Sequence, residues 1–149
     1  MATAEFEAIV EDFEFLDEWQ DRYRYIIDLG KSMDALPESR RLPDTKVDGC
    51  ASQVWIVASL REDNNEQRFI FQGDSDAMIV RGLIAILASL YNGVPLGDIN
   101  RINAGSELNR LSLREHLTAQ RSNGLASMVD RIHELATELT RTSSEIDQF

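Results

Sequence analysis

The stretch VWIVASLREDNNEQRFIFQGDSD, residues 54–76, is the part of the chain that most restricts the possible folds. Its first four residues are β-branched or aromatic without interruption, which is typical of a strand buried on both faces. The polar segment REDNNEQR, residues 61–68, has the composition of a turn, and Phe69–Phe71 resume the strand pattern. The stretch therefore predicts a β-hairpin with a long connection. Whether Val47, just upstream of the hairpin, forms a short third strand is left open.

Helices are predicted on both sides of this hairpin. Gly73 and the polar run Asp74–Asp76 end the second strand and are predicted to cap a helix over residues 79–91, whose nearly all-round apolar surface places it in the middle of the core. Apolar spacing of three and four residues predicts further helices at residues 6–13, about 17–33 and about 121–141. We therefore expect one α+β domain, residues 1–149, in which helices flank a small antiparallel sheet of two to three strands.

The charge balance restricts the partners. The chain carries 26 acidic and 15 basic residues, a formal net charge of −11. Nucleic acids and anionic membranes require concentrated positive charge, so both are excluded as partners and a neutral or basic protein surface is favoured. No apolar run approaches the roughly 20 residues of a transmembrane helix. Five acidic residues among the first fourteen argue against a signal or transit peptide, so we expect a soluble, cytoplasmic protein.

Cys50 is the only cysteine of the chain. One thiol cannot form an internal disulfide, and no cysteine–histidine cluster has the spacing of a metal site. Cys50 follows Asp48-Gly49 in a polar turn at the start of the predicted hairpin, where Gly49 permits a tight or left-handed backbone. A buried structural cysteine and an accessible reactive thiol are both consistent with this position.

Two histidines are candidates for the general base of a stand-alone thiol enzyme, His116 and His133. His133 falls within the predicted C-terminal helix, where a structural role is the simpler interpretation, so a catalytic pair would join Cys50 to His116. A docking module whose thiol does no chemistry is another alternative. The sequence contains no phosphate-binding loop, dinucleotide-binding fingerprint or serine-hydrolase elbow that would favour a different class of enzyme.

Three segments together resemble the SufE-like family of sulfur acceptors: VDGCASQVWI at 47–56, FQGDSDAMIVRGLIAIL at 71–87 and HLTAQRSNGLASMVDRI at 116–132. The resemblance extends from about residue 13 to about residue 139. It implies an α+β fold shared with cluster-scaffold proteins of the IscU type. It also implies a carrier and not an enzyme: the protein accepts persulfide sulfur from a cysteine desulfurase, stimulates that enzyme and delivers the sulfur to iron–sulfur cluster assembly.

The resemblance also assigns residues and partners. Cys50 is the implied acceptor, and Gly49, Gln53, Asp74 and Arg121 fall in the family's signature segments. Arg121 and Gln53 are expected to stabilise the thiolate or persulfide electrostatically. The implied partners are a pyridoxal-phosphate-dependent desulfurase of the SufS or CsdA kind and a cluster scaffold complex. No cofactor or metal is expected on this chain, because pyridoxal phosphate belongs to the partner. Whether the chain forms a homodimer is left open.

Overall fold

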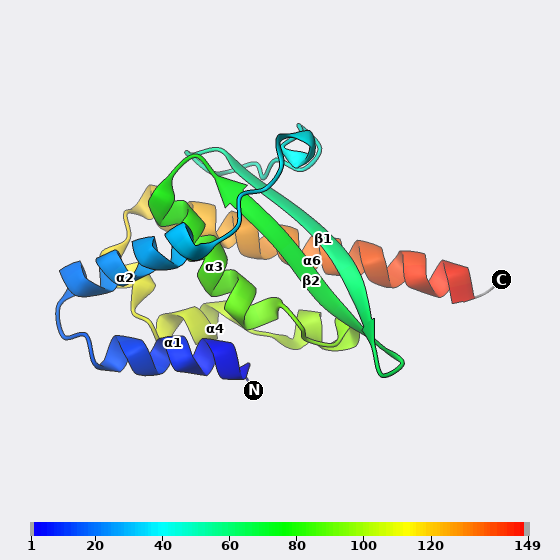
Figure 1. Ribbon diagram of the computed structural model, residues 1–149, viewed down its shortest axis with the longest axis horizontal. Coiled ribbons are helices and arrows are strands. Elements are labelled where there is room, and N and C mark those ends of the chain that lie inside the picture. The colour runs from blue at the N-terminus through cyan, green and yellow to red at the C-terminus, as the bar shows by residue number, and fades with distance from the viewer. Residues whose placement is uncertain (1, 148–149) are drawn as a thin grey trace.

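Helices pack on a two-stranded antiparallel sheet in residues 2–147, the part of the chain that the structure, a computed structural model, describes (Figure 1). The elements in chain order are α1 (Ala4–Glu14), α2 (Trp19–Ser32), the 3-10 helix η1 (Glu38–Arg40), β1 (Val54–Asp63), β2 (Glu66–Ser75), α3 (Met78–Tyr91), the 3-10 helix η2 (Leu96–Arg101), α4 (Ala104–Asn109), α5 (Leu113–His116) and α6 (Ala119–Asp147). The predicted α+β class is confirmed. The four predicted helices are present, and the C-terminal one is longer than expected at both ends.

The hairpin connection is much shorter than the sequence suggested. β1 and β2 pair without interruption from Val54↔Ser75 to Asp63↔Glu66, so the turn consists of two asparagines, Asn64 and Asn65. Both have positive φ, 52° and 64°, as in the type I′ turn whose twist matches that of antiparallel strands. The predicted long connection is therefore wrong. Most of the polar residues assigned to that connection lie instead in the paired strands, where they face solvent.

The strands are buried on one face, not on both as predicted. Val54 and Ile56 are buried, whereas Trp55 and Val57 are half-buried. This alternation is expected when only one face of an antiparallel sheet meets the core. The possible third strand reduces to a single bridge, in which the Val47 N–H donates to the Val54 carbonyl oxygen. The sheet within residues 2–147 accordingly has two strands.

α3 is the centre of the core, as its apolar surface predicted. Leu83, Ile86 and Leu87 are fully buried, and the helix contacts β2 on one side and α1 and α2 on the other. α2 and α3 cross so closely that a Cβ atom at Gly82 would lie 2.1 Å from the Ile26 carbonyl oxygen. This glycine is therefore required by the approach of the two backbones.

α6 and a loop complete the surroundings of the hairpin. α6 passes behind the strands in Figure 1. It contacts β1, whereas α3 contacts the neighbouring strand β2. On the other face, the loop between α2 and β1 places the Arg41 guanidinium 5.5 Å from the centre of the Trp55 ring. The first residues of β1, the first turn of α3 and the first turns of α6 converge at one end of the sheet.

Candidate functional site

Cys50 lies at this convergence and lines a cavity of about 70 Å³. The cavity combines residues from the cysteine turn, β1, α3 and the start of α6, which are far apart in the sequence. Its apolar wall is formed by Val54, Val80, Leu83 and Met128, and its polar wall by Ser52, Thr118, Gln120 and Arg121. The thiol therefore faces a small, mixed pocket and not a fully apolar core.

The Cys50 thiol is half-buried and held by α6. Its Sγ donates a hydrogen bond to the Gly124 carbonyl oxygen at 3.5 Å. Burial raises the pKa of the Cys50 thiol above its ordinary value, because the thiolate loses hydration. Among the described residues, Arg121 is the only charged residue in the cavity wall. The raised pKa favours the protonated thiol at neutral pH, and the cavity wall within the described residues contains no carboxylate or imidazole to take its proton.

The turn that carries Cys50 is fixed on both sides. Gly49 has a φ of 89°, so the backbone favours glycine here, and a Cβ atom would lie 2.5 Å from Ser127 Oγ on α6 and displace that hydroxyl. After the cysteine, the Gln53 N–H donates to the Asp76 carboxylate at 3.0 Å, and the Gln53 carbonyl accepts from the Asp76 N–H at 3.3 Å. The turn is thus a short loop pinned to α6 and to the segment before α3.

The structure places one of the expected supporting residues in the wall of the Cys50 cavity. Arg121 lines the cavity with Cys50. The Gln53 side chain is exposed and lies outside the cavity wall, and Gln53 contributes to the turn through its backbone. Gly49 shapes the turn as described. Of the supporting residues that the resemblance assigned, Arg121 is the one that shares the cavity with Cys50, and the shift in the pKa of the thiol comes from burial.

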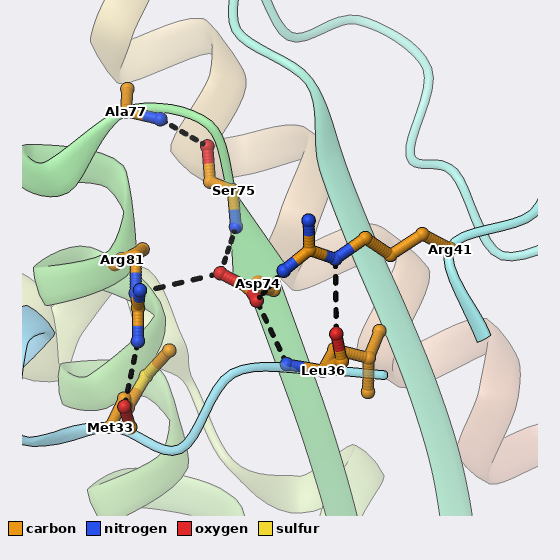
Figure 2. Close-up of polar contacts among 7 residues, drawn as sticks. All are labelled: Met33, Leu36, Arg41, Asp74, Ser75, Ala77 and Arg81. Carbon is orange, nitrogen blue, oxygen red and sulfur yellow. Dashed lines mark hydrogen bonds and ion pairs between the residues drawn. The ribbon is translucent and has the colours of Figure 1, made fainter. Parts of the chain in front are cut away.

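Asp74 belongs to a separate, buried polar cluster (Figure 2). Its side chain is 1% exposed. The Oδ2 atom accepts from Arg41 Nη2 at 2.7 Å and from the Leu36 N–H at 2.8 Å, while Oδ1 accepts from the Ser75 N–H and lies 3.5 Å from Arg81 Nε. Asp74 therefore ties the loop that precedes Cys50 to the end of β2 and to α3.

The predicted capping role of the Asp74–Asp76 run is largely wrong. The N-cap of α3 is Ala77, and no side chain forms the capping hydrogen bond. Ser75 comes nearest to that role, because its Oγ accepts from the Ala77 N–H at 3.2 Å. The acidic side chains have distant partners instead: Asp74 pairs with arginines, and Asp76 holds the cysteine turn.

Both histidines lie outside the Cys50 cavity. The exposed His116 ring stacks on Trp19, with 4.3 Å between the ring centres and 12° between the planes. His133 Nε2 lies 2.7 Å from the Tyr91 hydroxyl, and its Nδ1 lies 2.7 Å from Asn100 Oδ1. Burial lowers the pKa of His133. Neither imidazole is positioned as a base for Cys50 in this conformation.

Several cavity residues were not singled out from the sequence. Gly124 and Met128 lie one and two turns beyond Arg121 on α6, inside the segment that carried the resemblance, so their helical spacing could have identified them. Arg41 had no such signal, because its partner Asp74 lies 33 residues further along the chain.

The structure also shows no group of three metal-ligating side chains among the described residues. No helix in the same part of the chain is long and apolar enough to cross a membrane.

Comparisons with known proteins identify the family of this chain. The family model SufE, described as Fe-S metabolism associated domain, matches residues 7–136. A SufE-like protein of Rhizobium etli is 50% identical over 133 residues, which cover 89% of this chain and 90% of that protein. A SufE-like protein of Rhizobium meliloti is 49% identical over 124 residues, or 83% of this chain and 89% of that protein.

A solved structure shows the same fold. The solution structure of a hypothetical protein from Thermus thermophilus has a TM-score of 0.69 to this chain at 17% sequence identity. The match covers 93% of this chain and 97% of that one. With the family model spanning most of the sequence and two relatives about half identical to it, the chain belongs to the SufE family of Fe-S metabolism associated domains.

Proposed function

We propose that this protein is a sulfur carrier that accepts persulfide sulfur on Cys50 from a pyridoxal-phosphate-dependent cysteine desulfurase. The carrier stimulates the donor by removing its sulfur and delivers that sulfur to iron–sulfur cluster assembly. The observation that supports this most strongly is the setting of the thiol: Cys50 lines a small cavity whose wall, within the described residues, contains one cation, Arg121, and no carboxylate or imidazole. Such a site suits a reaction that a partner completes.

The proposed transfer is a thiol–persulfide exchange. The Cys50 thiolate attacks the outer sulfur of the donor persulfide; a bond from Cys50 Sγ to that sulfur forms, and the bond between the outer sulfur and the donor's cysteine breaks. The donor leaves as a thiolate, and no oxidant or reductant is consumed. Arg121 favours the thiolate and the anionic persulfide that replaces it. The Cys50 proton goes to water or to a group on the donor.

Donor binding has to open the site. In the resting state the thiol is half-buried and bonded to the Gly124 carbonyl, and its raised pKa keeps it protonated. The turn is held by the Cys50 Sγ–Gly124 hydrogen bond and by the Asp76–Gln53 pair, so these contacts are where movement would begin. Closure after transfer would hold the outer sulfur in the cavity, away from bulk thiols.

The test is a desulfurase assay with and without this protein, combined with its intact mass after incubation with desulfurase and cysteine. We expect faster release of alanine and a mass gain of one sulfur atom. Cys50→Ser is expected to lose both effects while it retains the fold. A wild-type protein that neither stimulates a panel of desulfurases nor gains sulfur would contradict the proposal.

The same assay separates the alternatives. His116→Ala is expected to behave as wild type, since this ring stacks on Trp19 and lies outside the cavity. Loss of activity in that variant, together with turnover of a small substrate without a partner, would instead indicate a Cys/His enzyme. A docking module would keep its biological function in Cys50→Ser. The proposal includes three further properties. Cytoplasmic location can be measured by fractionation, a cluster scaffold as recipient by pull-down, and a monomeric or homodimeric state by light scattering.

A further inference from the structure

Gly124 is a glycine inside a helix that does not require one in the resting structure. It lies in the second turn of α6, and its φ is not positive. A Cβ atom at this position would lie 3.6 Å from Cys50 Sγ, 3.8 Å from its Cα and 3.9 Å from its Cβ, all ordinary van der Waals separations. Alanine favours a helix over glycine by about fivefold per residue. The protein therefore carries the weaker helix former where alanine would fit.

The space left by this glycine faces the reactive sulfur. The three atoms nearest to an added Cβ, outside α6 itself, all belong to Cys50, and Gly124 lines the same cavity. The thiol hydrogen points at the Gly124 carbonyl. The outer sulfur of a persulfide is bonded about 2 Å from Sγ, and the Gly124 carbonyl oxygen lies only 3.5 Å from Sγ, so the outer sulfur cannot point at that oxygen and has to lie beside it, along α6 at Gly124. A larger atom then has to fit where the thiol now meets α6.

We infer that Gly124 is a positioning residue of the acceptor site, whose missing side chain provides the room for the outer sulfur of the Cys50 persulfide. The inference rests on the proposed function and adds a residue and a geometry to it. A methyl group at position 124 already contacts Sγ in the thiol state. The outer sulfur would have to turn away from α6, toward the side on which half-buried Cys50 meets solvent. There, small thiols would reduce it.

The test compares Gly124→Ala with a matched control, Gly105→Ala. Gly105 lies in α4, where a Cβ atom would contact only Asn103 Oδ1 at 3.6 Å, and it lies outside the Cys50 cavity. Gly124→Ala is expected to raise the melting temperature by about 2–4 °C. The persulfide, formed with desulfurase and cysteine and followed by intact mass, should be removed by dithiothreitol about tenfold faster than in the wild type, a change of about 1.4 kcal/mol in barrier.

The control and the affinity for the donor distinguish positioning from a general structural effect. Gly105→Ala should keep the wild-type persulfide lifetime, and Gly124→Ala should bind the desulfurase with unchanged Kd. Equal persulfide lifetimes in Gly124→Ala and the wild type would overturn the inference. So would a Gly124→Ala protein that does not fold, because the inference requires alanine to fit the resting fold. If the wild type itself gains no sulfur, the proposed function fails instead.

Discussion

Arg41 and Asp74 form an ion pair, with 2.7 Å between Arg41 Nη2 and Asp74 Oδ2, that joins the loop before Cys50 to the last residues of β2 (Figure 2). The Asp74 carboxylate is almost fully buried and also accepts from the Leu36 N–H. A buried carboxylate is stable only while its partners compensate for lost hydration. The cluster therefore stabilises the loop on the face of the sheet opposite the core.

Asp74→Asn is expected to lower the free energy of unfolding by about 3 kcal/mol, because it removes the charge on which two arginines converge. Urea denaturation measures the change. Asp98→Asn is the matched control, since Asp98 pairs with Arg101 on the surface, where both side chains are at least half exposed. That variant should lose less than about 0.5 kcal/mol. Equal losses in the two variants would show that the Asp74 cluster contributes no more than a surface pair.

Gly82→Ala is expected to destabilise the protein by about 3 kcal/mol, since the new methyl group would collide with the main chain of α2. The collision is with the Ile26 carbonyl oxygen, 2.1 Å from the Cβ position, which no side-chain rotation can relieve. Gly97→Ala, where nothing lies within 4 Å of the added atom, serves as control and should be nearly neutral. Thermal unfolding of both variants is the measurement, and a stable Gly82→Ala would contradict the close crossing of α2 and α3.

Acid should destabilise the contact between α3 and α6 through His133. The assignment that fits its partners has Nδ1–H donating to Asn100 and Nε2 accepting from the Tyr91 hydroxyl. Burial lowers the pKa of His133 and outweighs the nearby Asp130 carboxylate, which raises it. The unfolded chain therefore binds this proton more readily, so the contribution of His133 is present above the unfolded-state pKa of about 6.5 and is lost as pH falls toward the folded-state pKa.

This dependence can be measured by NMR titration of the His133 ring and by unfolding at several pH values. The expected midpoint is below that of an unstructured histidine. In His133→Gln the corresponding part of the pH dependence should disappear. A His133 midpoint at or above the value of the unfolded chain would contradict the role of burial.

Cys50 should respond to pH in the opposite sense. Burial raises the pKa of its thiol, so alkylation of the native protein should require a higher pH than alkylation of the urea-unfolded chain. The same shift favours the folded state fully below the unfolded-state pKa, and this contribution is lost as pH rises toward the folded-state pKa. Iodoacetamide kinetics measure both midpoints. Adding desulfurase should accelerate alkylation near neutral pH if binding opens the turn; identical native and unfolded midpoints would show that the cavity does not protect the thiol.

Local pattern was sufficient for most secondary structure. The apolar surface of residues 79–91 predicted the central helix α3, because a helix with so little polar surface is stable only inside the core. The hairpin was recognised from its two apolar runs. The composition of its connection predicts a longer loop, because composition alone does not reveal the left-handed backbone of Asn64 and Asn65 that makes a two-residue turn.

The order of residues was enough to establish an α+β chain with one free thiol in a glycine-containing turn, and its motifs indicated the family. Those properties depend on residues close together in the chain. What surrounds Cys50 came from the packing of distant segments, which placed Gly124 at the thiol and Arg121 in the wall of its cavity, and left Asp74 in a cluster with Arg41. Each of these contacts joins residues at least 33 positions apart. Such contacts depend on how helices and strands pack against one another, which short-range pattern does not encode.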